Sequence, residues 1–415
     1  MPDRGRYGPT MSIDVAAARA ATPGCHDRIH FNNAGSALPT ETVLQTQIEY
    51  LQLEARIGGY EAHAHEQDRI DAIRPTIARL IGADPSGDEI ALAVNNTAAF
   101  DLFVYSWAVS PDHAPDPGDR ILTTESEYGA NVVAYLQIAK RTGAVVEVVP
   151  SNEHGEIDLD ALDATIRRTD AGPAKLIALN HVPTNGGLVN PAAEVGAIAR
   201  AHGITYLLDA CQSTGQLPLD VDELGCDALT STGRKFLRGP RGTGFLYVRS
   251  SILPTLDPIV LDHSAADWVA PDRYEVLPTA GRFEQWERNY ASLLGLGQAA
   301  EEAMAVGLEA IAERVQRLAS RLREQLTDSV SGATVHDLGR HRCGIVTFSL
   351  DGADLPEVKA ALQAAGINVS IVPPASALID AQRRELPPML RASVHYYNTD
   401  DEIDRLIREL NSRAR

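Results

Sequence analysis

Short apolar runs alternate with helix-patterned segments between residues 89 and 232, and this alternation limits the possible folds more than any other feature. The pattern predicts strands at 89–94, 120–124, 145–149, 175–180, 204–209 and 226–232, with helices at 97–109, 130–143, 159–168 and 191–201. Continuous apolar runs are typical of strands that are buried on both faces. We therefore predict an α/β fold whose mostly parallel sheet is covered by helices on both sides.

The pattern changes after Pro258, where strands and helices no longer follow one another as repeated units. We predict a long helix at 292–326, strands at 344–350, 367–372 and 390–397, and helices at 356–365 and 400–410. Residues 269–283 have the composition of a loop. The expected organisation is a partly disordered arm at 1–22, a large domain at 23–290 and a smaller α+β domain at 291–415. A cleft between two such domains is a common place for small-molecule chemistry.

Charge and cysteine content argue against several classes of function. The 415 residues include 37 basic and 56 acidic side chains, and the resulting net charge of −19 repels nucleic-acid phosphates and anionic membranes. No run approaches the roughly 20 apolar residues of a membrane helix, and the N-terminus lacks an apolar signal core. We expect a cytoplasmic protein without nucleic-acid or membrane partners. The scattered Cys25, Cys211, Cys226 and Cys343 are predicted to be small core residues, with neither disulfides nor a metal site.

Two groups with complementary chemistry follow neighbouring predicted strands. Lys235 ends the motif Thr232-Gly233-Arg234-Lys235 ahead of a glycine-rich turn, and a lysine that loses solvent there can attack a carbonyl group. The alternative for such a motif is a solvated basic turn. Asp209 ends the strand 204–209, where it either caps a helix or holds a cationic ring nitrogen. A lysine and an aspartate in these roles are the two protein groups that pyridoxal phosphate chemistry requires.

With these motifs, the sequence resembles the class V aminotransferase family of fold-type I pyridoxal-phosphate enzymes over about residues 31–410. That family includes cysteine desulfurases, selenocysteine lyases, isopenicillin N epimerase and hercynylcysteine sulfoxide lyase. The resemblance implies a large domain with a mostly parallel seven-stranded sheet, a smaller α+β domain, a homodimer and bound pyridoxal 5′-phosphate. It assigns the Schiff base to Lys235, the ring nitrogen to Asp209 and the 3′-oxygen to Gln212.

Other segments match the family's cofactor contacts in the same order. The stretch AVNNTAAFDL implies that Asn96, Thr97 and the Ala98 N–H bind the phosphate at a helix N-terminus, where an ordinary helix cap is the alternative. In ESEYGAN, Tyr128 takes the place of a histidine that stacks on the cofactor ring, and it is a candidate proton donor to the leaving group. Thr232 and Arg234 are further expected cofactor contacts.

Substrate contacts are implied in three places. Arg391, in the family's RAS…YNT strand, is expected to bind the substrate α-carboxylate, because a guanidinium matches a carboxylate with two hydrogen bonds. Thr184 or Asn185, in NHVPTNGG, and Asn33 and Ala34, in FNNAGSALP, are expected to line the amino-acid substrate pocket. The alternatives are a surface ion pair for the arginine and simple turns for the other two segments.

The sequence departs from cysteine desulfurases where these carry their sulfur-accepting cysteine. The corresponding stretch, residues 369–388, contains no cysteine, and Trp286 and Glu287 replace the Gly-Thr of a phosphate clamp that the family takes from the partner subunit. GGY at 58–60 and RK-x-x-x-GPRG at 234–242 instead resemble the hercynylcysteine sulfoxide lyase group. We therefore expect a C–S β-lyase acting on a cysteine S-conjugate or its sulfoxide. An aminotransferase or epimerase is the main alternative, a desulfurase comes next and a non-catalytic scaffold last.

Overall fold

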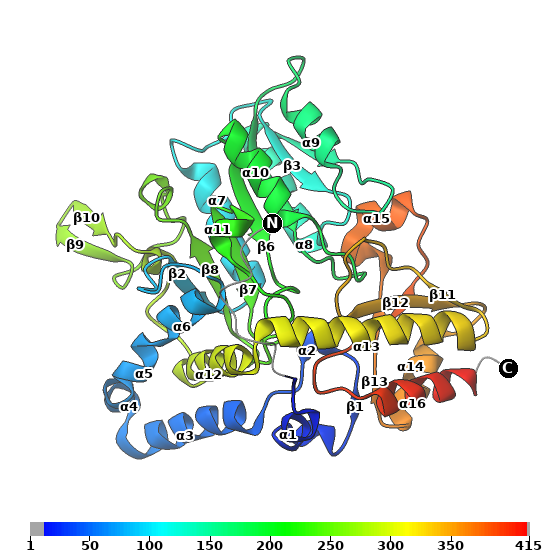
Figure 1. The fold of residues 1–415 in the computed structure, drawn as a ribbon. Helices are drawn as coiled ribbons and strands as arrows, with labels where there is room; N and C mark the ends of the chain where they lie inside the picture. Colours follow the sequence, from blue (N-terminus) through cyan, green and yellow to red (C-terminus); the bar gives the residue numbers. More distant parts are fainter. Residues whose placement is uncertain (1–11, 413–415) are drawn as a thin grey trace.

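A computed structural model describes residues 12–412, and its centre is a seven-stranded sheet (Figure 1). The strand order is β2-β8-β7-β6-β5-β3-β4, and β8 alone runs antiparallel to its neighbours. The bounds are β2 (Ile90–Ala93), β3 (Arg120–Thr124), β4 (Val145–Val149), β5 (Ala174–Asn180), β6 (Thr205–Asp209), β7 (Ala228–Thr232) and β8 (Gly244–Val248). The predicted mostly parallel, seven-stranded sheet is confirmed.

Alternate residues of each strand pack into two separate apolar layers. Leu208 and Phe245 face one layer, whereas Leu207 and Leu246 face the other. Helices α7 (Asn96–Val109) and α8 (Gly129–Thr142) cover the second layer. The first is covered by α3 (Glu41–Ile57), α6 (Ile73–Leu80), α9 (Leu159–Ile166), α10 (Ala192–His202), α11 (Val221–Leu224) and α12 (Tyr290–Val306). Burial on both faces explains why these strands read as continuous apolar runs.

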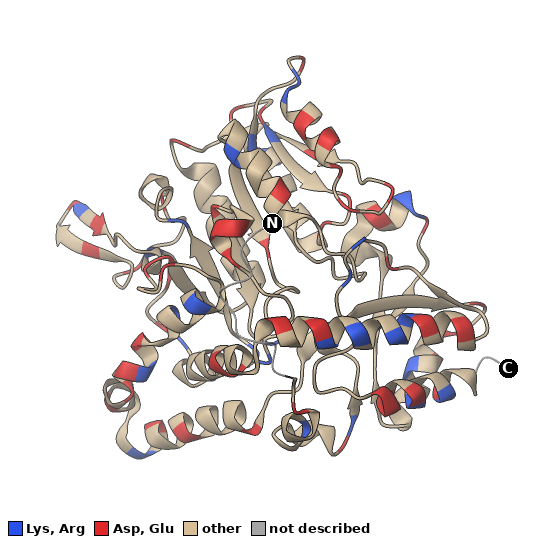
Figure 2. Ribbon diagram, in the orientation of Figure 1, with Lys and Arg blue, Asp and Glu red and all other residues tan. Residues whose placement is uncertain are grey.

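The C-terminal part forms a second core on a four-stranded antiparallel sheet of order β11-β12-β15-β14. Its strands are β11 (Ala333–Val335), β12 (Ile345–Leu350), β14 (Ser370–Val372) and β15 (Met389–Ser393). Its helices are α13 (Leu308–Ser329), α14 (Leu355–Ala364), α15 (Leu378–Arg383) and α16 (Asp400–Asn411). Acidic and basic side chains interleave along α13 and α16 (Figure 2), and Arg317–Asp400 and Arg321–Asp404 pair across them.

The N-terminal segment packs against this C-terminal part. Strand β1 (Ile29–His30) pairs in parallel with β13 (Ile367–Asn368), and helix α2 (Asn33–Ser36) follows it. The arm predicted at 1–22 lies partly outside the described residues, and its remainder contains helix α1 (Val15–Ala20). The 3-10 helix η1 (Pro23–Cys25) belongs to this region. The short helices α4 (Gly59–His65) and α5 (Gln67–Asp71) follow α3 and instead add Ala62 and Ile70 to the first apolar layer of the large sheet. The domain boundaries given above remain predictions.

Several predicted elements differ from the structure. The strand expected at 367–372 is divided into β13, which pairs with β1, and β14, which pairs with β15, and the strand expected at 390–397 ends at Ser393. The helix expected at 292–326 is divided into α12 and α13 at Gly307, whose φ of 92° lies in a region that glycine adopts at little cost. The loop expected at 269–283 contains part of a hairpin, β9 (Ala266–Ala270) with β10 (Arg273–Val276), which projects from the body (Figure 1). The 3-10 helices η2 (Leu253–Thr255), η3 (Ala280–Phe283) and η4 (Pro374–Ala377) lie in connecting segments. In the described part of the chain, no helix is long and apolar enough to cross a bilayer.

Arg238 joins three distant segments just after the Lys235 turn. Its guanidinium donates to the carbonyl of Leu38 (2.8 Å), to the hydroxyl of Thr22 (2.6 Å) and to the hydroxyl of Tyr396. It also lies over the rings of Tyr396 and Tyr397, 5.2 and 4.7 Å from their centroids. The residue is 4% exposed and holds a left-handed backbone with φ of 65°. These contacts compensate the buried charge without a carboxylate partner among residues 12–412.

We expect Arg238→Ala to lower the free energy of unfolding by about 3 kcal/mol, because buried acceptors and ring faces lose a charged partner. Urea denaturation of the apoprotein, followed by circular dichroism, measures this change. Arg241→Ala is the control, since Arg241 lies on the same turn but is exposed, and we expect it to change stability by less than about 0.5 kcal/mol. Equal losses in the two variants would contradict the structural role of Arg238.

Candidate functional site

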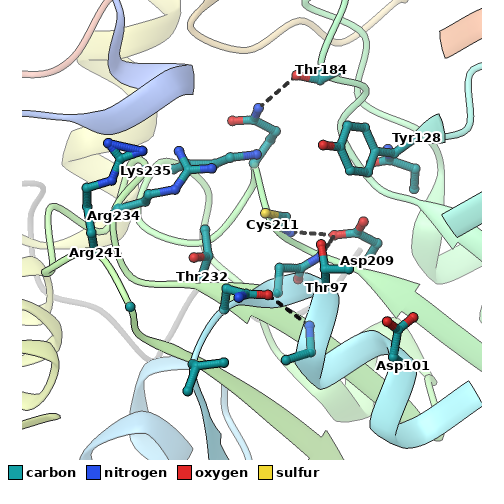
Figure 3. Close-up of a pocket in the computed structure, with 17 residues that line it drawn as sticks. Thr97, Asp101, Tyr128, Thr184, Asp209, Cys211, Thr232, Arg234, Lys235 and Arg241 are labelled. Carbon is teal, nitrogen blue, oxygen red and sulfur yellow. Dashed lines mark hydrogen bonds between the residues drawn. The ribbon is translucent and has the colours of Figure 1, made fainter. Parts of the chain in front are cut away.

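A pocket of about 550 Å³ opens at the carboxyl ends of β6 and β7, beside the first turn of α7 (Figure 3). This edge of an open α/β sheet is where such folds bind ligands. Arg234, Lys235 and Arg241 reach it from one side, and Tyr128 lies opposite them. The predicted residues that line it are Asn96, Thr97, Ala98, Tyr128, Thr184, Asp209, Gln212, Thr232, Arg234 and Lys235.

Asp209, the last residue of β6, is the buried acidic group of the pocket. Its carboxylate accepts hydrogen bonds from the side chain of Asn131 (2.8 Å), the N–H of Cys211 (2.9 Å) and the side chain of Asn96 (3.3 Å). Burial raises the pKa of Asp209, while these donors and the charge of Lys235 lower it. No basic side chain forms an ion pair with this carboxylate among the described residues. It can therefore accept a hydrogen bond from a cationic N–H of a ligand without competition from a protein cation.

Lys235 is held at the pocket by a tight turn after β7. The N–H of Gly233 and the hydroxyl of Thr232 both donate to the carbonyl of Thr243, each at 3.0 Å. A Cβ atom at Gly233 would lie 2.3 Å from the hydroxyl oxygen of Thr243, so only glycine fits this close approach. The sequence has four lysines, Lys140, Lys175, Lys235 and Lys359, and Lys235 is the one that lines this pocket.

Another part of the pocket lining is suited to an anion. Thr97 and Ala98 lie in the first turn of α7, where the helix dipole favours negative charge, and Arg241 adds a cation. The Ala98 N–H already donates to the side-chain oxygen of Asn95 (2.8 Å), so Asn95 is the ordinary helix cap that was named above as the alternative. The guanidinium of Arg234 donates to the carbonyl of Gly35.

A chain of hydrogen bonds connects Gln212 to Arg391. Gln212 donates to the carbonyl of Ala34 (3.2 Å) and to the hydroxyl of Thr184 (3.3 Å). Arg391 donates to that hydroxyl (2.8 Å) and to the Thr184 carbonyl (3.0 Å). Burial, with the nearby charge of Arg234, lowers the pKa of Arg391 to about 10. No carboxylate pairs with Arg391 in the described part of the chain, so this guanidinium can receive an acidic ligand.

Four of the expected substrate residues do not line this pocket: Asn33, Ala34, Asn185 and Arg391. Arg391 is linked to it through Thr184, and the N–H of Ala34 donates to the hydroxyl of Ser393 (2.8 Å). Asn33 is buried and donates to the carbonyls of Ser393 (2.6 Å) and His30 (3.2 Å), so it joins the N-terminal turn to β15. Asn185 instead lines a separate cavity of about 20 Å³ beneath η4 and α15, where neither atom of its amide has a partner. Their positions depend on tertiary packing that the turn motifs did not indicate.

Several residues in the pocket or in contact with its residues were not predicted. Cys211 lines the pocket, so its prediction as a core residue is wrong, whereas Cys226 and Cys343 are buried as expected. Asn131 contacts Asp209, and its position three residues after Tyr128 in ESEYGAN was the available signal. Asp101 also lines the pocket, one helical turn after Thr97. Among residues 12–412 there is no group of three or more His, Cys, Asp or Glu side chains arranged to hold a metal ion.

Comparison with known proteins gives a consistent result. The family model of class-V aminotransferases matches residues 29–406. The chain is 30% identical over 407 residues to a cysteine desulfurase of Escherichia coli (strain SE11), covering 96% of this chain and 97% of the relative. The solved apo structure of a cysteine desulfurase from Thermococcus onnurineus NA1 has a TM-score of 0.87 and 26% identity, covering 98% and 99% of the two chains. A lysine variant of C-DES with glycine covalently linked to its pyridoxal-phosphate cofactor has a TM-score of 0.82 and 23% identity, covering 95% and 98%.

Borohydride reduction of the holoprotein, followed by peptide mapping, tests the position of the lysine. We expect the cofactor on the peptide that contains Lys235, since only that lysine lines the pocket. Lys235→Ala should remove the reducible linkage, and Lys359→Ala, which changes a lysine of α14, should retain it. Label on another lysine of the wild type would overturn the assignment.

Proposed function

Since this chain belongs to the class-V aminotransferase family and is a pyridoxal-phosphate-dependent enzyme, we propose that it cleaves the Cβ–S bond of a cysteine-derived amino acid. The observation that supports an amino-acid substrate is the buried guanidinium of Arg391, which has no carboxylate partner among the described residues. Thr184 links this guanidinium to the pocket of Lys235 and Asp209. The desulfurase activity of the relatives supports the C–S bond as the point of cleavage.

The pocket residues fit pyridoxal phosphate. Lys235 offers an amine for its aldehyde, Asp209 an acceptor for its ring N–H, and Thr97 with Arg241 an anion site for its phosphate. The buried side-chain oxygens of Gln212 and Asn96 lack hydrogen-bond partners, which is consistent with a polar ligand at this position. When bound, the cofactor supplies an electron-withdrawing ring that acidifies the substrate Cα–H.

The chain's own residues would then act in turn. Arg391 binds the substrate carboxylate and thereby orients Cα toward Lys235, whose amine takes the α-proton. The Cβ–S bond then breaks, the electron pair leaves with sulfur, and hydrolysis of the remaining fragment gives pyruvate and ammonia. Asp209 keeps the ring nitrogen protonated throughout. In this proposal Tyr128, which lies across the pocket, protonates the leaving sulfur group.

The segment at 369–388 supports an S-conjugate or its sulfoxide as the substrate. This segment contains β14, η4 and α15 but no cysteine, and the carbonyl of Ala375 lies 3.1 Å from the place of a Cβ at Gly129. The segment therefore packs next to Tyr128 without offering a sulfur-accepting thiol. In our proposal the sulfur leaves with its own substituent.

A cysteine desulfurase is the second candidate, and the activity of the relatives favours it. Desulfuration needs an acceptor for the sulfur atom, and of the four cysteines only Cys211 lines the pocket. A desulfurase built on this chain would therefore use Cys211 or an external thiol. For the assembly and location we propose a cytoplasmic homodimer, which the family resemblance supports.

Product analysis distinguishes these reactions. We expect the holoenzyme to convert an S-alkyl-cysteine sulfoxide to equal amounts of pyruvate and ammonia, because β-elimination releases both. Alanine and sulfide from L-cysteine, with no pyruvate from any conjugate, would establish a desulfurase instead. A keto acid with the carbon skeleton of the substrate would indicate transamination, and an inverted α-carbon would indicate an epimerase.

Arg391→Ala tests the carboxylate site. Charged hydrogen bonds contribute about 1.5–3 kcal/mol each, so losing the guanidinium should lower kcat/KM by about 100-fold, mainly through KM. The visible absorbance of the bound cofactor should remain, since Arg391 lies outside the cofactor contacts. Arg405→Ala, an exposed arginine of α16, is the control and should leave both unchanged. Unchanged kinetics in Arg391→Ala would remove this residue from the carboxylate role.

A further inference from the structure

A second buried carboxyl group lies behind Asp209 in the segment between β3 and α8. Glu127 is 2% exposed, and both of its carboxyl oxygens accept hydrogen bonds. Its Oε1 accepts from the N–H of Tyr128 (2.7 Å) and from the side chain of Asn131 (3.0 Å). Its Oε2 contacts the hydroxyls of Thr123 (3.0 Å) and Tyr135 (3.5 Å). Glu127 does not line the pocket, and the chemistry proposed above does not use it.

Asn131 connects the two carboxyl groups. Its side-chain nitrogen donates to Oε1 of Glu127 (3.0 Å) and to Oδ2 of Asp209 (2.8 Å), and an amide NH₂ has two hydrogens for this purpose. Since Glu127 and Asp209 share one donor group, ionising both places two negative charges close together in a buried region. Such a pair favours a proton on one member.

The surroundings of Glu127 indicate which carboxyl keeps that proton. The titratable groups that face it are Asp209 from β6 and Tyr135 from α8, while β3 contributes the neutral Thr123, and Lys235 acts on Asp209 from the pocket. Oε1 of Glu127 already accepts two N–H groups. A proton on Glu127 therefore sits on Oε2, which faces the hydroxyls of Thr123 and Tyr135. Burial, and secondly the charge of Asp209, raise the pKa of Glu127 to about 7.

We propose that Glu127 is a positioning residue that acts through Asn131 on Asp209 and adjusts the negative charge facing the cofactor ring nitrogen. When Glu127 is protonated, Asp209 carries the charge alone. When Glu127 ionises, the added charge makes nearby cationic N–H groups of the cofactor harder to deprotonate. The inference rests on the proposed function only in placing Asp209 at the ring nitrogen.

The test compares Glu127→Gln with wild type by titrating the absorbance of the bound cofactor against pH, without substrate. Above about pH 7, where Glu127 is ionised in the wild type, loss of its negative charge should move the midpoint to lower pH by about one unit, the smallest shift usual for a charge at close range. Glu125→Gln is the matched control, because Glu125 lies two residues earlier, is also buried, and binds Ser151 and Arg383. It should leave the midpoint in place, and an unchanged midpoint in Glu127→Gln would overturn the proposal.

The stability of the apoprotein gives an independent readout. The native pKa of Glu127 is about 7 and its reference value is 4.5, so the folded state binds more protons between these pH values. Its free energy of unfolding should therefore fall as pH rises through this window, and Glu127→Gln should flatten that fall. Equal slopes in the variant and the wild type would contradict a proton held on Glu127.

Asn131→Ala keeps the proposal falsifiable if Glu127→Gln does not fold. Without the shared amide, the midpoint should shift even though both carboxyls remain, and a wild-type midpoint would overturn the role of Asn131. None of these readouts involves C–S cleavage. A shifted midpoint without pyruvate would refute the proposed function alone, whereas pyruvate with unshifted midpoints would refute this inference alone.

Discussion

The pocket depends on one buried charge, the carboxylate of Asp209. Because it lies at the end of a central strand, three elements must bring donors to it: Asn96 from α7, Asn131 from α8 and the backbone after β6 itself. A carboxylate without such donors would be costly in this environment. The arrangement of helices α7 and α8 on one face of the sheet therefore serves the site as well as the core. Their first turns bring the amide side chains of Asn96 and Asn131 to this carboxylate. The first turn of α7 also forms the anion site of the pocket.

Much of the fold could be predicted, because strands that are buried on both faces are continuous apolar runs in the sequence. The strands expected at 120–124 and 145–149 have the observed bounds, and the other predicted strands of this sheet differ by one or two residues at their ends. The strand β8 was not predicted, since its GFLYV follows a glycine-rich turn and stands outside the strand–helix alternation. The division of the long helix at Gly307 was also missed, because the amphipathic pattern continues across the glycine.

Among the site residues, those in continuous motifs could be found from the sequence, whereas those defined by tertiary contacts could not. Lys235, Asp209, Gln212 and Tyr128 belong to continuous motifs, and the structure brings them to one pocket. Asn33 and Asn185 were assigned because their segments resemble family motifs, but such a match says nothing about the direction of a side chain. Glu127 and Asn131 were unnoticed because their importance comes from burial against β6, a contact between residues far apart in sequence.

Arg238 has a consequence for how the protein is made. It binds Thr22 near the start of the chain and Tyr396 near its end, and it lies three residues after Lys235. During synthesis the turn that carries this lysine emerges well before Tyr396, which lies in a turn after β15 and contacts Arg238. The contacts that hold this turn are therefore complete only after the segments of Thr22 and Tyr396 have both been made and have packed around the guanidinium of Arg238.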